Sequence, residues 1–165
     1  MKLSIDYFTQ AVGYSEDFPE DLVTCYNNLS CYYKKLNNNI EALKYLEKAL
    51  QLLYTKLIRL DDQNFNQTKA ISSLADTHLN LSAVLSQSRN HQNALLHSKK
   101  ALMLLQSEIL SNQISPLQKY SERWCVLIIA YYNMGAEYEH LKMVSGYLSS
   151  TKPLNRMKAP HHIQR

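Results

Sequence analysis

Hydrophobic residues recur along the chain with the spacing of a helix that buries one face. In the clearest stretch, Tyr26, Leu29 and Tyr33 stand at positions i, i+3 and i+7, with mostly polar residues between them. This spacing gathers the three side chains into one stripe along a helix. The pattern therefore predicts an amphipathic helix through this stretch.

A second apolar stripe follows after a short polar break. Ala42, Leu46 and Ala49 stand at i, i+4 and i+7, and alanine lets two helix backbones approach closely. The break at residues 35–39 ends in three consecutive asparagines, and asparagine tolerates the left-handed geometry of a helix end. The two stripes predict an antiparallel helical hairpin with alanine at the closest contact.

The same pattern returns at a nearly constant interval. The stretches 26–33, 78–85 and 131–138 each read aromatic or histidine, any residue, asparagine, aliphatic, small. Their aliphatic residues are 52 and 53 positions apart and are Leu29, Leu81 and Met134. Ala94 and Ala101 follow the second stretch at the offsets that Ala42 and Ala49 have from the first. We therefore expect a repeat protein.

These residues resemble the tetratricopeptide repeat family. The resemblance rests on Tyr26, Leu29, Ser30, Tyr33, Ala42, Leu46 and Ala49, and again on His78, Leu81, Ser82, Leu85, Ala94, Ser98 and Ala101. The family's usual period is about 34 residues, so the units here are longer, and the extra length falls at residues 50–66 and 102–116. The resemblance implies an all-α, right-handed α-solenoid of antiparallel helical hairpins with long helices.

The repeats divide the chain into units of unequal completeness. Ser4, Phe8 and Ala11 have the spacing found in the second helix of a hairpin. The array is therefore expected to begin halfway through a unit. The expected organisation is a half unit at 1–14, units at 23–66 and 67–115, a half unit at 116–142, and a basic, flexible tail at 143–165. Phe8, Tyr131, Met134 and Tyr138 are expected to be exposed, because their stripes lack a partner helix.

The charge of the chain is concentrated at one end. The formal net charge is +4, but four basic and no acidic residues follow position 142, so residues 1–142 carry 14 charges of each sign. A nucleic-acid binder is expected to carry a basic face on its folded part, so we expect no nucleic-acid partner and least favour an RNA-binding repeat.

Neither a membrane span nor a leader is expected. No apolar run approaches the roughly 20 residues that cross a bilayer, and the first residues lack the apolar region of a secretory signal. We expect a cytoplasmic protein without membrane attachment, and the long repeats raise the further hypothesis of a cytoskeletal or ciliary assembly.

Three asparagines share one place in the repeat. Asn28, Asn80 and Asn133 directly precede the aliphatic residues, so each is rotated about 100° from the buried stripe. In stacked hairpins the first helices line the concave surface, and an amide can donate to a peptide C=O while accepting from an N–H. Peptide-binding members of the family resemble this arrangement. The alternative is that the three asparagines share this position by coincidence, because the chain has 13 asparagines.

Further candidates for a peptide-binding groove follow from the same face. These residues are Lys35, Gln87, Asp76, Tyr132 and His140. Lys35 could meet an acidic group of a ligand, and the alternative is an ordinary solvated lysine. Ala83, Ser86, Ala136 and Glu139 stand where a clamp for a C-terminal carboxylate would need basic residues, so such a ligand is not favoured.

Catalytic and metal chemistry find no support in the motifs. The three cysteines lack zinc-ligand spacing, and the six histidines lack a partnered cluster. No phosphate loop or nucleophile elbow is present. We expect no enzyme activity, no metal and no cofactor. The favoured function is a protein-binding adaptor or scaffold. The alternative is a structural subunit whose half units are completed by neighbouring chains, with self-association through its ends.

Overall fold

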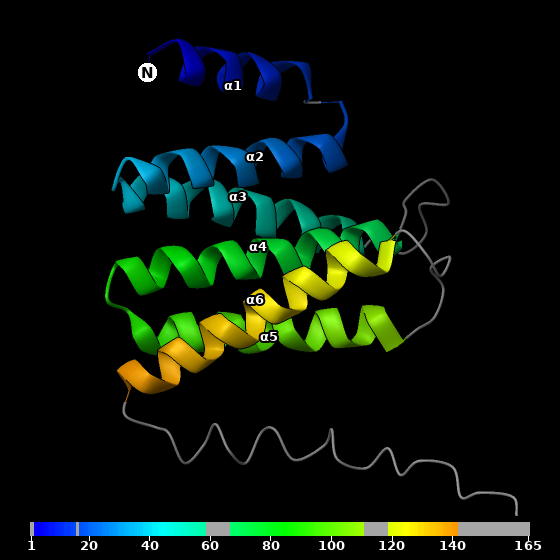
Figure 1. Ribbon diagram of the computed structural model, residues 1–165. Coiled ribbons are helices and arrows are strands. Elements are labelled where there is room, and N and C mark those ends of the chain that lie inside the picture. Colours follow the sequence, from blue (N-terminus) through cyan, green and yellow to red (C-terminus); the bar gives the residue numbers. More distant parts are fainter. Residues whose placement is uncertain (1, 16, 59–66, 111–118, 142–165) are drawn as a thin grey trace, which may run out of the picture.

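The regular structure of the described residues is entirely helical (Figure 1). The computed structural model describes residues 2–15, 17–58, 67–110 and 119–141. Its helices are α1 (Lys2–Tyr14), α2 (Pro19–Lys35), α3 (Asn39–Ile58), α4 (Gln67–Gln87), α5 (His91–Leu110) and α6 (Lys119–His140). Each helix packs against the next. This confirms the predicted all-α fold of stacked hairpins, which resemble tetratricopeptide repeats and have long helices.

Two hairpins, α2–α3 and α4–α5, are closed by turns of the same geometry. Asn37 and Arg89 stand 52 positions apart, and both adopt the left-handed conformation, with φ of 57° and 58°. The amide of Asn38 donates to the carbonyl of Tyr33 at 2.9 Å, and that of Asn90 donates to Leu85 at 2.9 Å. Such bonds satisfy carbonyls that a helix end leaves without partners.

The residue after each left-handed position caps the following helix. The Asn38 Oδ1 accepts from the Glu41 backbone N–H at 3.3 Å, and the Asn90 Oδ1 accepts from Asn93 at 3.4 Å. A side-chain acceptor at this place satisfies one of the free N–H groups at a helix start. The polar breaks therefore both end one helix and begin the next.

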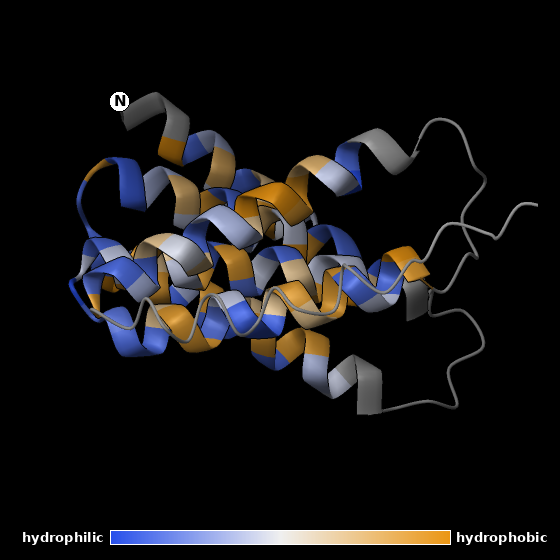
Figure 2. Ribbon diagram, turned by 60° about the horizontal axis from the view of Figure 1, so that its bottom comes forward, coloured by the Kyte–Doolittle hydropathy of each residue, from blue (hydrophilic) through white to orange (hydrophobic). Residues whose placement is uncertain are grey.

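The core lies where the repeats predict it. The described helices alternate between hydrophobic and hydrophilic segments (Figure 2), as expected of helices with one buried side. The aliphatic residues Leu29, Leu81 and Met134 are buried, and Ala42 and Ala94 have no exposed surface. Leu81 packs with Ala42 in a cluster that joins the two hairpins. The alanines thus mark close helix contacts, as predicted.

The expectation for the apolar stripe of the last helix is wrong. Met134 and Tyr138 are buried, because α6 crosses α4 and α5 obliquely (Figure 1) and turns its stripe onto the preceding hairpin. Tyr131 is half-buried, and its hydroxyl accepts from the Gln106 Nε2 at 2.9 Å. Phe8 is also half-buried, with its ring centroid 5.8 Å from that of Tyr32.

A different side of α6 is exposed instead. Its exposed large apolar residues are Trp124, Ile128, Ile129 and Tyr132. The expected flexible tail at 143–165 lies outside the described residues, as do the connections at 59–66 and 111–118.

Candidate protein-binding face

The first helices of successive hairpins form one continuous face. The backbone of α2 approaches that of α4, and the backbone of α4 approaches that of α6, whereas no Cα atoms of α3 and α5 lie within 8 Å of each other among the described residues. Every candidate residue of the predicted groove belongs to α2, α4 or α6. The face is therefore built from three helices, each of which contributes one of the three asparagines in the repeat.

The amides on this face differ in their surroundings. Asn28 is exposed, whereas Asn80 and Asn133 are half-buried. The Asn80 Nδ2 donates to the Asn27 Oδ1 at 3.0 Å, and the Asn27 Nδ2 donates to the Thr77 Oγ1 at 2.9 Å. The amide of Asn80 therefore also takes part in the contact between α2 and α4, a role that the repeat pattern did not predict.

Three of the other candidates, Lys35, Gln87 and His140, are the last residues of α2, α4 and α6. Lys35 and Gln87 are exposed, and the Gln87 Nε2 donates to the Asn37 Oδ1 at 2.6 Å, which links the ends of α2 and α4. Tyr132 is 76% exposed. His140 is exposed, and its ring stacks on that of His91 with centroids 4.3 Å apart.

Asp76 belongs to a polar cluster that joins three helices. The Arg123 guanidinium on α6 bonds the Asp76 Oδ1 on α4 at 2.9 Å and the Glu108 Oε2 on α5 at 2.7 Å. Ser72 donates to the other oxygen of Glu108 at 2.6 Å. Burial raises the pKa of Asp76, and the nearby Arg123 opposes that rise. We call Ser72, Asp76, Glu108 and Arg123 the arginine cluster.

The sequence pattern did not reveal the arginine cluster. Arg123 stands 15 and 47 positions after its two acidic partners, so no helical spacing connects them. The one available signal was a charged residue, Glu108 or Arg123, on a helix face that is otherwise apolar.

A second buried polar group lies behind the face. The Nδ1 atoms of His78 and His97 are 2.9 Å apart, and the Tyr54 hydroxyl lies 3.3 Å from the His78 Nε2. Burial lowers the pKa of His78 to about 4 and also lowers that of His97. Both rings are therefore neutral at pH 7, so that an N–H of one ring can donate to the bare nitrogen of the other.

The described part of the chain contains no cluster of metal-ligating side chains. No three of its histidine, cysteine, aspartate and glutamate side chains lie together as a metal site would need. Cys25, Cys31 and Cys125 are free thiols.

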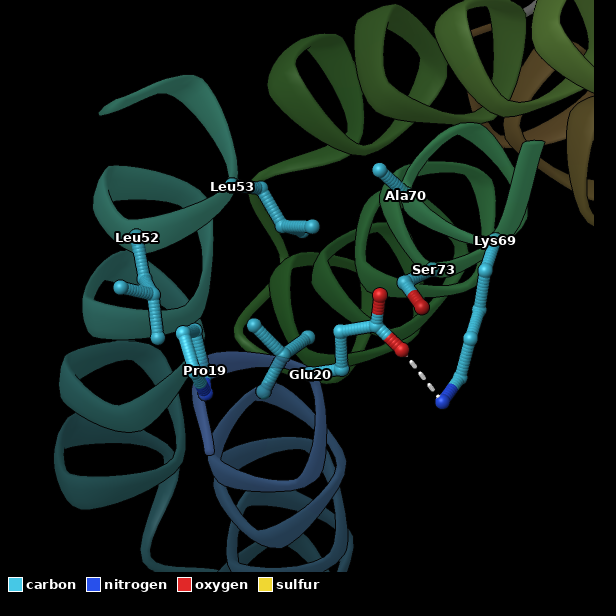
Figure 3. A pocket seen from close by; sticks show the side chains of 8 residues that line it. Pro19, Glu20, Leu52, Leu53, Lys69, Ala70 and Ser73 are labelled. Carbon is cyan, nitrogen blue, oxygen red and sulfur yellow. Dashed lines mark ion pairs between the residues drawn. The ribbon is translucent and has the colours of Figure 1, made fainter. Parts of the chain in front are cut away.

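A shallow hollow between α2, α3 and α4 is too small for a ligand (Figure 3). Its lining residues include Pro19, Leu53 and Ala70, and an ion pair between Glu20 and Lys69 lies at its edge. The space open to a water-sized molecule is about 10 Å³, close to the least that a single water needs.

Stacked hairpins with a continuous face of first helices define a helical-repeat protein. Residues 22–57 match the family model described as tetratricopeptide repeat, and this range spans most of α2 and α3. Residues 22–57 are therefore a tetratricopeptide repeat, which confirms the resemblance seen in the residues of this unit. No curated protein and no solved structure matches the chain.

The match to this family indicates a class of function. Tetratricopeptide repeats are typically protein–protein interaction modules without catalytic chemistry of their own. None of the described helices is both long enough and apolar enough to span a membrane.

Proposed function

We propose that this protein is an interaction module that holds an extended segment of a partner protein along the α2–α4–α6 face. The observation that carries the proposal is the shared position of Asn28, Asn80 and Asn133, one on each of three helices that contact in turn. A partner crossing the three helices would meet one amide on each.

The packing of the helices supports a concave face. The backbones of the first helices approach each other, whereas those of α3 and α5 stay more than 8 Å apart, measured between Cα atoms of the described residues. A stack that is closer on one side than on the other curves toward the closer side. The α2–α4–α6 face is then on the inside of the curve, where repeat proteins hold their partners.

The chemistry of the face suits a peptide backbone. An amide supplies both a donor and an acceptor, which are the groups that an extended peptide presents at each residue. Each net hydrogen bond would contribute about 0.5–1.5 kcal/mol. Asn28 is exposed and ready to bond, whereas Asn80 would share or exchange its bond to Asn27. We therefore assign the larger contribution to Asn28.

The flanking residues would add specificity. In this proposal Lys35 and Gln87 lie along one side of the bound segment, and Tyr132 offers an exposed ring to an apolar side chain. His140 and Asp76 complete the set. We place this activity in the cytoplasm, where the three free thiols would stay reduced.

The proposal is tested with peptides selected from a random displayed library on the intact chain. The selected peptides are titrated by fluorescence anisotropy against the parent and the triple variant Asn28→Ala, Asn80→Ala, Asn133→Ala. We expect the triple variant to bind about 10- to 1000-fold more weakly, which corresponds to a loss of a few hydrogen bonds. Binding should change little with salt, because the contacts are neutral.

A matched control separates the face from a general effect of lost amides. Asn93→Ala removes an exposed amide from α5, outside the proposed face, and should leave the affinity unchanged. Equal binding by the parent and the triple variant would refute the groove. A steep loss of binding with salt would instead indicate phosphate or charge contacts.

A second candidate function is a structural subunit within a larger assembly, and the exposed apolar side of α6 favours it. Trp124, Ile128 and Tyr132 lie exposed at positions i, i+4 and i+8 of one helix. Apolar surfaces of this kind mark interaction sites. A cytoskeletal or ciliary assembly would suit such a subunit. Size measurement on the purified chain tests whether it associates with itself.

A further inference from the structure

The exposed side of α6 corresponds, by position in the repeat, to the side of α4 that α5 covers. Ile128 and Tyr131 stand 53 positions after Ala75 and His78, the interval that also separates Met134 from Leu81. Ala75 and His78 are buried, and His78 lies against His97 of α5. Ile128, by contrast, is 64% exposed, and no described helix covers it.

Helix α6 packs against α5 in the same register in which α4 packs against α3. The Tyr54 hydroxyl of α3 lies 3.3 Å from His78 of α4, and the Gln106 Nε2 of α5 donates to Tyr131 of α6 at 2.9 Å. Tyr54 and Gln106 are 52 positions apart, and His78 and Tyr131 are 53 apart. Helix α6 is therefore placed as a first helix, with its open side where a second helix would pack.

Helix α1 is placed as a second helix. Phe8 and Ala11 stand 38 positions before Leu46 and Ala49, the residues through which α3 packs. The Phe8 ring contacts Tyr32 of α2. In the same way Leu46 clusters with Val84 of α4, and Val84 stands 52 positions after Tyr32. Helix α1 therefore lies on α2 as α3 lies on α4.

The two hairpins share a ring contact at the same position of the repeat. Tyr45 of α3 lies 6.0 Å from Tyr26 of α2, measured between ring centroids. His97 of α5 lies 5.1 Å from His78 of α4. On α6 the corresponding ring is Tyr131, and on α1 the residue 38 positions before Tyr45 is Tyr7.

The two open sides thus carry complementary residues. Tyr7 is 63% exposed and would meet a ring at the position of Tyr26, which Tyr131 provides. Gly135 stands where Ser82 faces Ser98 across the second hairpin, at 2.6 Å between hydroxyls. The α1 residue at the position of Ser98 is Phe8, and the absence of a side chain on Gly135 leaves room for its larger ring.

We propose that α6 of one copy pairs with α1 of a second copy as the two helices of a hairpin. Tyr7 of the second copy then lies against Tyr131, Phe8 against Gly135, and α1 covers Ile128. The contact continues the α2–α3 and α4–α5 interfaces and makes the second candidate function specific, but it does not depend on the asparagine face. Because the two surfaces differ, the contact is head-to-tail, and copies join into open chains or closed rings.

The test uses the full chain and two variants, each blocked at one surface. Tyr7→Glu places a charge on the α1 side, and Ile128→Glu places one on the α6 side. Both positions are more than half exposed, so the monomer should keep its helical content by circular dichroism. A buried, unpaired carboxylate is costly, so we expect each variant to associate at least about 100-fold more weakly than the parent.

Mixing the two variants distinguishes the proposed contact from other modes of association. The Tyr7→Glu chain keeps an intact α6 side and the Ile128→Glu chain keeps an intact α1 side, so the mixture can form one junction. Sedimentation velocity should show larger species that grow with concentration for the parent, monomers for each variant, and a 1:1 dimer for the mixture.

Several results would overturn the proposal. A parent that stays monomeric throughout the concentration series excludes the contact, including the case in which the chain's own residues cover α6. Association of Tyr7→Glu at parental strength would indicate a symmetric contact between α6 helices. A mixture that stays monomeric also excludes head-to-tail pairing. The asparagine triple variant should associate like the parent, so failure of the groove and failure of this contact are separately visible.

Discussion

At the scale of single residues, the second hairpin uses histidines where the first uses tyrosines. Tyr26 and Tyr45 contact each other through their rings, whereas His78 and His97 also share a hydrogen bond between their Nδ1 atoms. That bond requires at least one ring to present a bare nitrogen. Protonation of both histidines would place two cations at hydrogen-bond distance in a buried position. The histidine pair therefore makes the stability of this hairpin depend on pH.

The sign of this dependence follows from the pKa of His78. Burial, together with the nearby positive charges of His97 (when it is protonated) and Lys100, lowers that pKa to about 4, whereas a histidine in an unfolded chain has a pKa of about 6.5. Between these values the unfolded chain binds a proton that the folded chain does not. The free energy of unfolding should therefore fall as the pH drops from about 6.5 toward 4, by on the order of 3 kcal/mol.

Urea unfolding at a series of pH values measures this effect. The double variant His78→Tyr, His97→Tyr copies the ring pair of the first hairpin and should flatten the pH dependence. His140→Gln removes an exposed histidine and should leave the slope close to that of the parent. A double variant with the full parental slope would show that other groups cause the dependence.

Asparagine shows how far single residues could be predicted from the sequence. The polar breaks predicted that asparagines end one helix, and Asn37 and Asn38 do so through a left-handed turn and a cap. The bond between Asn80 and Asn27 could not be predicted, because it depends on how far α4 is displaced along α2. The repeat spacing determines the side of a helix on which a residue lies, but not its partner on the next helix.

At the scale of helices, the hairpins follow closely from the apolar spacing. Ala42 and Ala94 have no exposed surface and lie where two helix backbones approach. The sequence predicted these contacts because they depend on residues within one hairpin, whose short turn brings the two stripes together. Leucine at these positions would force the helices apart or the side chain out of its preferred rotamer.

Ala42→Leu and Ala94→Leu should each lower the free energy of unfolding by about 1–3 kcal/mol, the usual cost of overpacking. The measurement is urea unfolding followed by circular dichroism at 222 nm, a standard helix signal. Gln51→Leu places the same side chain at an exposed position of α3 and should change the stability by less than about 0.5 kcal/mol. Parental stability in both alanine variants would mean that the assigned register of the hairpins is wrong.

At the scale of the whole molecule, the contacts between hairpins could not be predicted from the sequence pattern. The repeat predicted that α6 is a first helix, but its apolar stripe was expected to be exposed. The oblique crossing of α6 over α4 and α5 instead buries Met134 and Tyr138. That crossing also brings Arg123 to Glu108 and Asp76. Both outcomes depend on the angle between hairpins, which no local spacing encodes.

The arginine cluster should couple α6 to the rest of the fold. The Glu108 side chain is 3% exposed and the Arg123 side chain is 16% exposed, so the pair is largely removed from water. Replacing one member of such a pair leaves a buried charge without its counter-ion, which is costly. Arg123→Met keeps much of the apolar stem of the arginine while removing its charge. We expect it to lower the free energy of unfolding by roughly 3 kcal/mol.

The loss of stability in Arg123→Met should affect α6 more than the other helices. Amide hydrogen exchange in Arg123→Met should increase most in α6, because the arginine cluster is a polar attachment of that helix to α4 and α5. Protection in α2 and α3 should change less. Lys44→Met removes a lysine whose pair with Glu41 is mostly exposed, with 60% of the lysine side chain accessible, and should change stability by less than about 0.5 kcal/mol. The double variant Arg123→Met, Glu108→Met should recover part of the loss, because neither charge is then left buried alone. If Arg123→Met proves no more costly than Lys44→Met, the apolar contacts of Met134 and Tyr138 hold α6 in place without the arginine cluster.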